Sequence, residues 1–156
     1  MSDIQRRRPR AIALCVFSNK ERILVEEGYD PLKQQHFYRP IGGSIEYGEY
    51  SRDALIREIH EEINAEVQQV RYLGVLENIF SFAGEQGHEI AFIYDALFVD
   101  LAFYRRERFD GVEDDNTSIT VVWKALSFFD EGNVPLYPDG LMELLNASGC
   151  GTPRQR

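Results

Sequence analysis

The chain has 156 residues, of which 44% are hydrophobic and 12% aromatic, enough to build the core of one domain. Its 26 acidic and 17 basic residues give a net charge of −9. This charge disfavours broad contact with nucleic acid or an anionic membrane, because phosphate groups need a basic surface. No apolar stretch approaches the ~20 residues that cross a bilayer. A small phosphorylated substrate remains compatible, since it needs only a local basic patch or a metal ion.

The N-terminal segment is predicted to be a strand and not an export signal. Arg6, Arg7 and Arg8 precede the apolar residues 11–17, but no small-residue cleavage pattern follows them. Such a short apolar run favours a buried first strand behind a basic arm. Cys15 and Cys150 lie far apart and have no zinc-type partner nearby, which favours free thiols in a reducing, cytoplasmic location.

Strands dominate the expected elements. Apolar, branched and aromatic residues predict strands over residues 11–17, 22–27, 70–82, 89–99 and 117–126. A glycine-containing turn over 84–87 makes a hairpin of two of these strands. Polar and turn-forming residues predict loops over 28–37 and 105–118. With helices expected over 51–63 and 139–145, the pattern predicts an α/β fold with a mixed sheet and helices packed on it.

The helix over residues 51–63 has the clearest periodicity. Its apolar side chains fall within about 100° of arc at 3.6 residues per turn; they are Leu55, Ile56, Ile59 and Ile63. Ser51 is the expected N-terminal cap, and Asn64 is expected to end the helix in the left-handed conformation.

Three carboxylates share a second arc of the same helix. At 100° per residue, Glu58, Glu61 and Glu62 converge beside the apolar stripe. Like charges at this spacing repel each other, and only Arg57 offers local relief. An acidic cluster of this kind favours an external cation, and a ligand set made only of oxygens suits Mg²⁺ or Mn²⁺.

Gly42 and Gly43 precede the carboxylate helix and let the backbone approach a ligand closely. Mg²⁺ in proteins commonly combines a few carboxylates with water and substrate phosphate oxygens. The combination predicts a seat for a metal-chelated pyrophosphate and attack of a metal-activated water on phosphorus. A solvated acidic helix face is the alternative reading of the glutamates alone.

The joint spacing resembles the Nudix box, G-x5-E-x7-R-E-U-x-E-E-x-G-U, in which U is aliphatic. The matching positions are Gly43, Glu49, Arg57, Glu58, Ile59, Glu61 and Glu62. Asn64 replaces the terminal glycine and Ala65 the final aliphatic residue, and neither change removes a metal ligand. The order of expected strands extends the resemblance to a single domain over residues 8–148, with loose termini at 1–7 and 149–156.

The resemblance implies a Nudix (MutT-like) hydrolase with an α/β/α sandwich around a mixed sheet. Such enzymes use Mg²⁺ or Mn²⁺ to cleave a nucleoside diphosphate linked to another group. Carried over by position, Glu58, Glu61 and Glu62 are the metal ligands with the Gly42 carbonyl, and Arg57 pairs with Glu49. The general base stays open between a carboxylate of the box and four outside it, which are Glu89, Glu113, Asp114 and Asp115.

Residues around the box are candidates for substrate contact. Arg39 suits a phosphate, Tyr38 and its aromatic neighbours suit a base, and Gly43 and Glu89 are expected to line the site. Each has an ordinary alternative, namely a surface ion pair, core packing or an exposed strand end. The chain has no proline between Pro40 and Pro135, whereas ADP-ribose-cleaving relatives usually carry one soon after the box. The expected substrate is therefore a nucleoside triphosphate, a nucleotide sugar or another diphosphate compound.

Two other functions remain open from the sequence. A non-catalytic nucleotide sensor on the same fold would lose metal ligands, and the complete glutamate set disfavours it. A 5′-end RNA pyrophosphohydrolase would need a basic stripe, which the net charge of −9 disfavours. The expected partner is therefore a small nucleotide-type substrate without membrane or long nucleic-acid contact, and the aromatic content is compatible with a homodimer.

Overall fold

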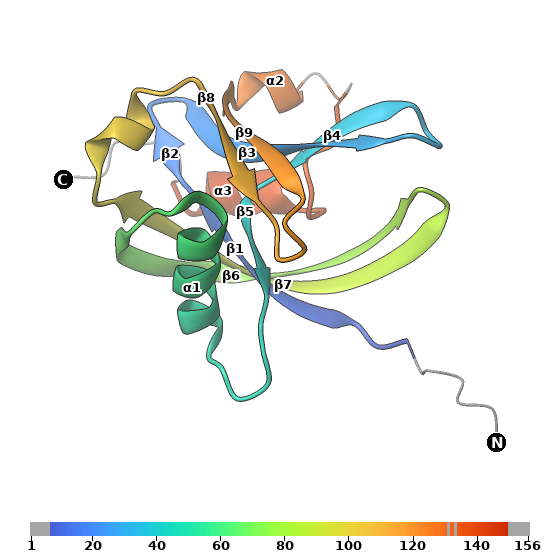
Figure 1. Ribbon diagram of the computed structural model, residues 1–156. Helices are drawn as coiled ribbons and strands as arrows, with labels where there is room; N and C mark the ends of the chain where they lie inside the picture. The colour runs from blue at the N-terminus through green and yellow to red at the C-terminus, as the bar shows by residue number, and fades with distance from the viewer. Residues whose placement is uncertain (1–6, 131, 133, 150–156) are drawn as a thin grey trace.

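The computed structural model describes residues 7–130, 132 and 134–149, and its elements form two curved sheets with helices around them (Figure 1). The first sheet is mixed. Its central strand β1 pairs in parallel with β7 and antiparallel with β5, and β6 pairs antiparallel with β7. In spatial order the strands are β5 (Ile41–Ser44), β1 (Arg10–Val16), β7 (Glu85–Phe98) and β6 (Val67–Phe82).

The second sheet is antiparallel and lies across the first (Figure 1). Its long strand β3 also pairs with β4 outside the main path. The main path runs β2 (Ser18–Asn19), β3 (Arg22–Asp30), β9 (Ser118–Ala125) and β8 (Arg108–Val112), with β4 over Gln35–Arg39.

Alternate side chains of β1 enter two separate cores. Ala13 and Cys15 pack with the apolar face of helix α1 (Ser51–Ile63), whereas Ile12, Leu14 and Val16 pack with Leu141 and Leu145 of helix α3 (Leu141–Ala147). Successive side chains of a strand point to opposite faces, so these helices cover opposite sides of the mixed sheet. The predicted α/β fold with a mixed sheet between helices is confirmed, and the second sheet is the addition.

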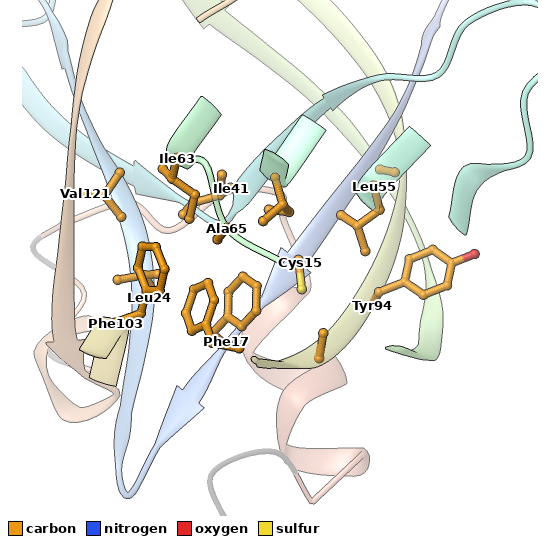
Figure 2. Close-up of a cluster of buried hydrophobic side chains, with 14 of the residues drawn as sticks. Cys15, Phe17, Leu24, Ile41, Leu55, Ile63, Ala65, Tyr94, Phe103 and Val121 are labelled. Carbon is orange, nitrogen blue, oxygen red and sulfur yellow. The ribbon is translucent and has the colours of Figure 1, made fainter. Parts of the chain in front are cut away.

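The core beneath α1 is rich in aromatic rings (Figure 2). Phe17 and Phe98 stack with ring centroids 3.8 Å apart, and Phe103, from the short 3-10 helix η1 (Leu101–Tyr104), stacks on Phe98 at 4.6 Å. Leu55 and Ile59 of α1 are completely buried in the same cluster. Their burial fixes the rotation of α1 about its axis, and that rotation determines where its glutamates point.

Several local predictions need correction. Residues 28–37, expected as a loop, contain the end of β3 and the start of β4, because these segments pair with each other. Residues 105–118, also expected as a loop, contain β8, which is held by β9. A short helix, α2 (Ser127–Asp130), was not expected. Cys15 is buried and forms no disulfide among the described residues, as predicted, while Cys150 lies outside the described residues.

The ends of α1 were predicted with mixed success. Ser51 is the first helical residue and does not cap the helix; its Oγ lies 2.6 Å from the Tyr94 hydroxyl. Asn64 does end the helix in the left-handed conformation, with φ 53° and its N–H donated to the His60 carbonyl. Asparagine is one of the few residues that adopt this conformation readily, so it substitutes for the glycine of the motif.

Candidate active site

Helix α1 presents its glutamates beside the apolar face, as its periodicity predicted. Glu58 and Glu62 are buried, with 1% and 2% of their surface exposed, and Glu61 is exposed. Asp114, which follows β8, lies with Glu58 and Glu61 in a group whose carboxylate oxygens are within 4.8 Å of one another. This group joins a residue of a distant loop to the motif.

Arg57 holds the motif loop against the helix. Its Nε and Nη2 donate to the two oxygens of Glu49 at 2.9 Å each, and Nη2 also donates to the Ser44 carbonyl. Its Nη1 donates to Glu58 Oε1 at 2.9 Å and to Glu61 Oε2 at 3.1 Å. The Arg57 hydrogen bonds lower the pKa of Glu49 to about 2, so Glu49 stays ionised near neutral pH. One guanidinium thus positions two of the expected metal ligands.

Gly42 and Gly43 are required by close packing. A Cβ at Gly42 would overlap the backbone of Ala13 on the paired strand β1. A Cβ at Gly43 would lie 2.6 Å from the carboxyl carbon of Glu58. The glycine at position 43 therefore makes room for the buried Glu58 carboxylate.

Buried carboxylate oxygens that accept no hydrogen bond mark this site. Among the described residues they are Glu26 Oε2, Glu58 Oε2 and both oxygens of Glu62. Burial, followed by the charges of Glu113, Glu26 and Glu58, raises the pKa of Glu62 to about 10. Burial likewise raises the pKa of Glu58, although the Arg57 hydrogen bond opposes it. Leaving ionised carboxylates buried and unpaired is unfavourable, so an oxygen-binding divalent cation fits this donor set.

Glu26 is a site residue that the sequence analysis missed. It lies on β3 opposite Arg39 of β4, with 3.7 Å between Glu26 Oε2 and Arg39 Nε. Glu113 is close to it, and burial together with Glu26 raises the pKa of Glu113 to about 7. Burial alone would lower the pKa of Arg39, but the charges of the nearby carboxylates together outweigh burial and raise it. In the sequence, Glu26 stands out only as a charged residue directly after the buried run Ile23-Leu24-Val25. Its place at the site follows from the pairing of β3 with β4, which puts it opposite Arg39.

The other predicted residues separate into two groups. Glu89 is buried and lines a cavity together with Arg39, and it pairs with Arg10 at 3.2 Å. Tyr38 is a correction: only 6% of it is exposed, and its ring packs against Phe128 and Phe129 in the second core. Side chains alternate along β4, so Phe37 lines the cavity instead.

Of the four outside candidates for the general base, the structure brings two to the motif helix. Asp114 joins the oxygen cluster, and Glu113 acts electrostatically on Glu62. Asp115 is exposed and accepts the Thr117 N–H at 2.9 Å, which makes it a turn residue. Glu89 lies on the cavity side next to Arg39.

The family assignment follows from comparison with known proteins. A family model described as the NUDIX domain matches residues 6–126, more than half of the chain. The chain belongs to the NUDIX family. The carboxylate helix and the glycine-containing loop that Arg57 holds against it both lie within the residues that match this family.

One curated relative and three solved structures illustrate the likeness. The methanol dehydrogenase activator of Bacillus methanolicus is 28% identical over 109 residues, which cover 70% of this chain and 55% of that protein. The chain thus spans about half the length of this relative.

The solved structures share the fold at low sequence identity. A MutT NUDIX hydrolase from Burkholderia pseudomallei has a TM-score of 0.60 at 20% identity, covering 90% of this chain and 98% of its own. A NUDIX hydrolase from Nitrosomonas europaea gives 0.62 at 16% identity over 92% and 90%. The E. coli ORF135 protein gives 0.56 at 19% identity over 99% and 100%. No helix among the described residues is long and apolar enough to span a membrane.

Proposed function

We propose that this NUDIX protein is a Mg²⁺- or Mn²⁺-dependent pyrophosphohydrolase that cleaves a nucleoside diphosphate linked to another group. This proposal is supported chiefly by the buried carboxylate oxygens that accept no hydrogen bond, namely Glu58 Oε2 and both oxygens of Glu62, beside the exposed Glu61. These residues, with Asp114 and the Gly42 carbonyl, would hold the cation. When bound, the cation supplies charge neutralisation at phosphorus and a more acidic water.

The surrounding side chains have distinct roles in the proposed reaction. Arg57, fixed by Glu49, orients Glu58 and Glu61 and so sets the geometry of the ligands. Arg39 lines the cavity near the carboxylates, and its forked guanidinium suits a phosphate oxygen of the substrate. Of the four outside candidates, Asp114 clusters with Glu58 and Glu61, and Glu113 acts electrostatically on Glu62, so we propose that the general base comes from this pair or from the motif.

The substrate is proposed to be a nucleoside triphosphate or a nucleotide sugar. The sensor alternative would require loss of ligands, whereas the chain retains all three glutamates of the motif. The RNA alternative is disfavoured by the net charge of −9. A single domain over residues 8–148, a cytoplasmic location and a homodimer stay predictions; of the expected loose termini, 1–6 and 150–156 lie outside the described residues.

A substrate panel with metal control tests the proposal. Phosphate and nucleotide release are measured for nucleoside triphosphates, nucleotide sugars and dinucleotides with Mg²⁺, Mn²⁺ or EDTA. The expected result is metal-dependent cleavage of one class, abolished in Glu61→Gln and Glu62→Gln. Glu77→Gln is the matched control, since Glu77 is exposed on β6, at the edge of the mixed sheet opposite to β5. Turnover that survives in both site variants within a few-fold would refute the site assignment.

A further inference from the structure

Two β-hairpins face each other next to the carboxylate site. The β3–β4 hairpin leaves the second sheet and the β6–β7 hairpin leaves the first, and they run in the same direction (Figure 1). The cavity between them has a volume of about 180 Å³. Its lining includes Arg39 and Glu89 near the carboxylates and Asp30 and Lys33 near the hairpin tips.

Each hairpin carries the same cross-strand pair on its inner face. Phe37 of β4 lies opposite Gly28 of β3, and Phe80 of β6 lies opposite Gly87 of β7. A Cβ at either glycine would overlap the partner's ring. Each ring therefore lies across its own hairpin, and Phe37 also meets Phe82 of the opposite hairpin edge-on, with ring centroids 5.8 Å apart. This arrangement keeps an open slot with an aromatic wall on each hairpin.

Tyr137 closes one side of the slot. Its ring centroid lies 5.8 Å from that of Phe37 and 6.3 Å from that of Phe80, so it spans the two walls. Asn78 adds a polar group among these rings, and it is 4% exposed. Because Asn78 Oδ1 accepts the Asp139 N–H at 3.2 Å, its amide hydrogens are the part left to donate to a ligand.

The tips of the two hairpins are tied together. Asp30 on β3 accepts the Ala83 N–H from the β6–β7 turn at 3.3 Å, and Lys33 Nζ donates to the Ser81 carbonyl at 2.8 Å. Asp30 also accepts the Leu32 and Lys33 N–H groups, which fixes its carboxylate. These contacts hold the hairpins at a set separation and close the end of the slot that is remote from the metal-binding glutamates.

We propose that this slot binds the planar nucleobase of the substrate between Phe37 and Phe80, with Gly28 and Gly87 as the residues that keep the two walls apart. The proposal rests on the proposed function, which places the phosphates at Arg39 and the carboxylates. Aromatic faces bind bases by stacking, which is worth about tenfold or more in affinity per base. A cavity of about 180 Å³ has room for a planar ring system.

The test measures nucleoside binding without metal, by ligand-observed NMR and calorimetry in EDTA. The probes are adenosine, guanosine, cytidine, uridine and, as a compound without a base, ribose 5-phosphate. Gly87→Ala and Gly28→Ala are expected to weaken nucleoside binding tenfold or more, because the new Cβ pushes a ring into the slot. Phe80→Leu should do the same by removing one wall. Gly132→Ala is the control, since a Cβ there meets no atom within 4 Å among the described residues.

The outcomes separate this proposal from the proposed function. No detectable binding of any nucleoside, or folded Gly87→Ala and Gly28→Ala proteins with unchanged nucleoside binding, would overturn the slot. Metal-dependent hydrolysis of a diphosphate compound by the same preparation would then still support the hydrolase. Nucleoside binding that is lost in the slot variants but kept in Glu61→Gln would support the slot even if every hydrolysis assay failed.

Discussion

Replacing Gly43 with alanine places a methyl group against the most buried glutamate of the site. The added Cβ would lie 2.6 Å from the carboxyl carbon of Glu58. Carbon atoms pack without repulsion from about 3.5 Å, so the carboxylate has to retreat by about 1 Å. A catalytic group displaced by that distance costs about 100-fold in rate, equivalent to about 2.7 kcal/mol of transition-state stabilisation.

The Gly43→Ala assay compares kcat, KM and Mn²⁺ affinity with those of the wild type. We expect kcat to fall about 100-fold and Mn²⁺ to bind more weakly, while the protein remains folded by circular dichroism. Gly132→Ala is the control for a general loss of stability, because its backbone at φ 70° is strained by a side chain but remote from Glu58. A Gly43→Ala enzyme within twofold of wild type in both kcat and Mn²⁺ affinity would refute the reasoning.

The other predictions concern charge and pH. Arg57→Lys should lower kcat at least tenfold, because one ammonium group cannot replace the paired hydrogen bonds to Glu49 together with those to Glu58 and Glu61. An Arg57→Lys enzyme with wild-type kcat would show that Arg57 does not position these glutamates for turnover. The pKa of Glu62 is raised from 4.5 to about 10, so the contribution of Glu62 to metal-free stability should be greatest below pH 4.5 and fall as pH rises toward 10. In EDTA, the melting temperature of the wild type should fall as pH rises, and that of Glu62→Gln should fall less. Equal dependence of the two melting temperatures on pH would count against a buried carboxylate at Glu62. Added Mn²⁺ should raise the melting temperature more at pH 8 than at pH 6, because the cation displaces the proton; an equal rise would argue against binding at Glu62.

The helix and its carboxylates were predictable because their information is local. A 3.6-residue period places Glu58 and Glu62 beside the apolar stripe, and burial of Leu55 and Ile59 then fixes where they point. Asn64 ended the helix as expected because the left-handed preference belongs to the residue itself.

The missed features depend on strand pairing between distant segments. Residues 35–37 have the composition of a loop, and they form a strand because they pair with β3. Glu26 belongs to the site because the same pairing places it opposite Arg39. Tyr38 was misplaced by one residue, since side chains of a strand alternate and its neighbour Phe37 received the cavity position. The slot lies between the β3–β4 and β6–β7 hairpins, whose contacting residues are about 50 positions apart in the sequence. Local sequence patterns do not predict contacts at such a separation.

The most direct test of the account is a titration of the metal-free protein with Mn²⁺, followed by calorimetry, alongside turnover on the cleaved substrate class. We expect Mn²⁺ to bind the wild type, to bind at least tenfold more weakly to Glu62→Gln and to Glu61→Gln, and to bind Glu77→Gln with unchanged affinity. Wild-type Mn²⁺ affinity and turnover in both Glu61→Gln and Glu62→Gln would contradict the proposed metal site. The buried oxygens of α1 that accept no hydrogen bond would then bind no cation.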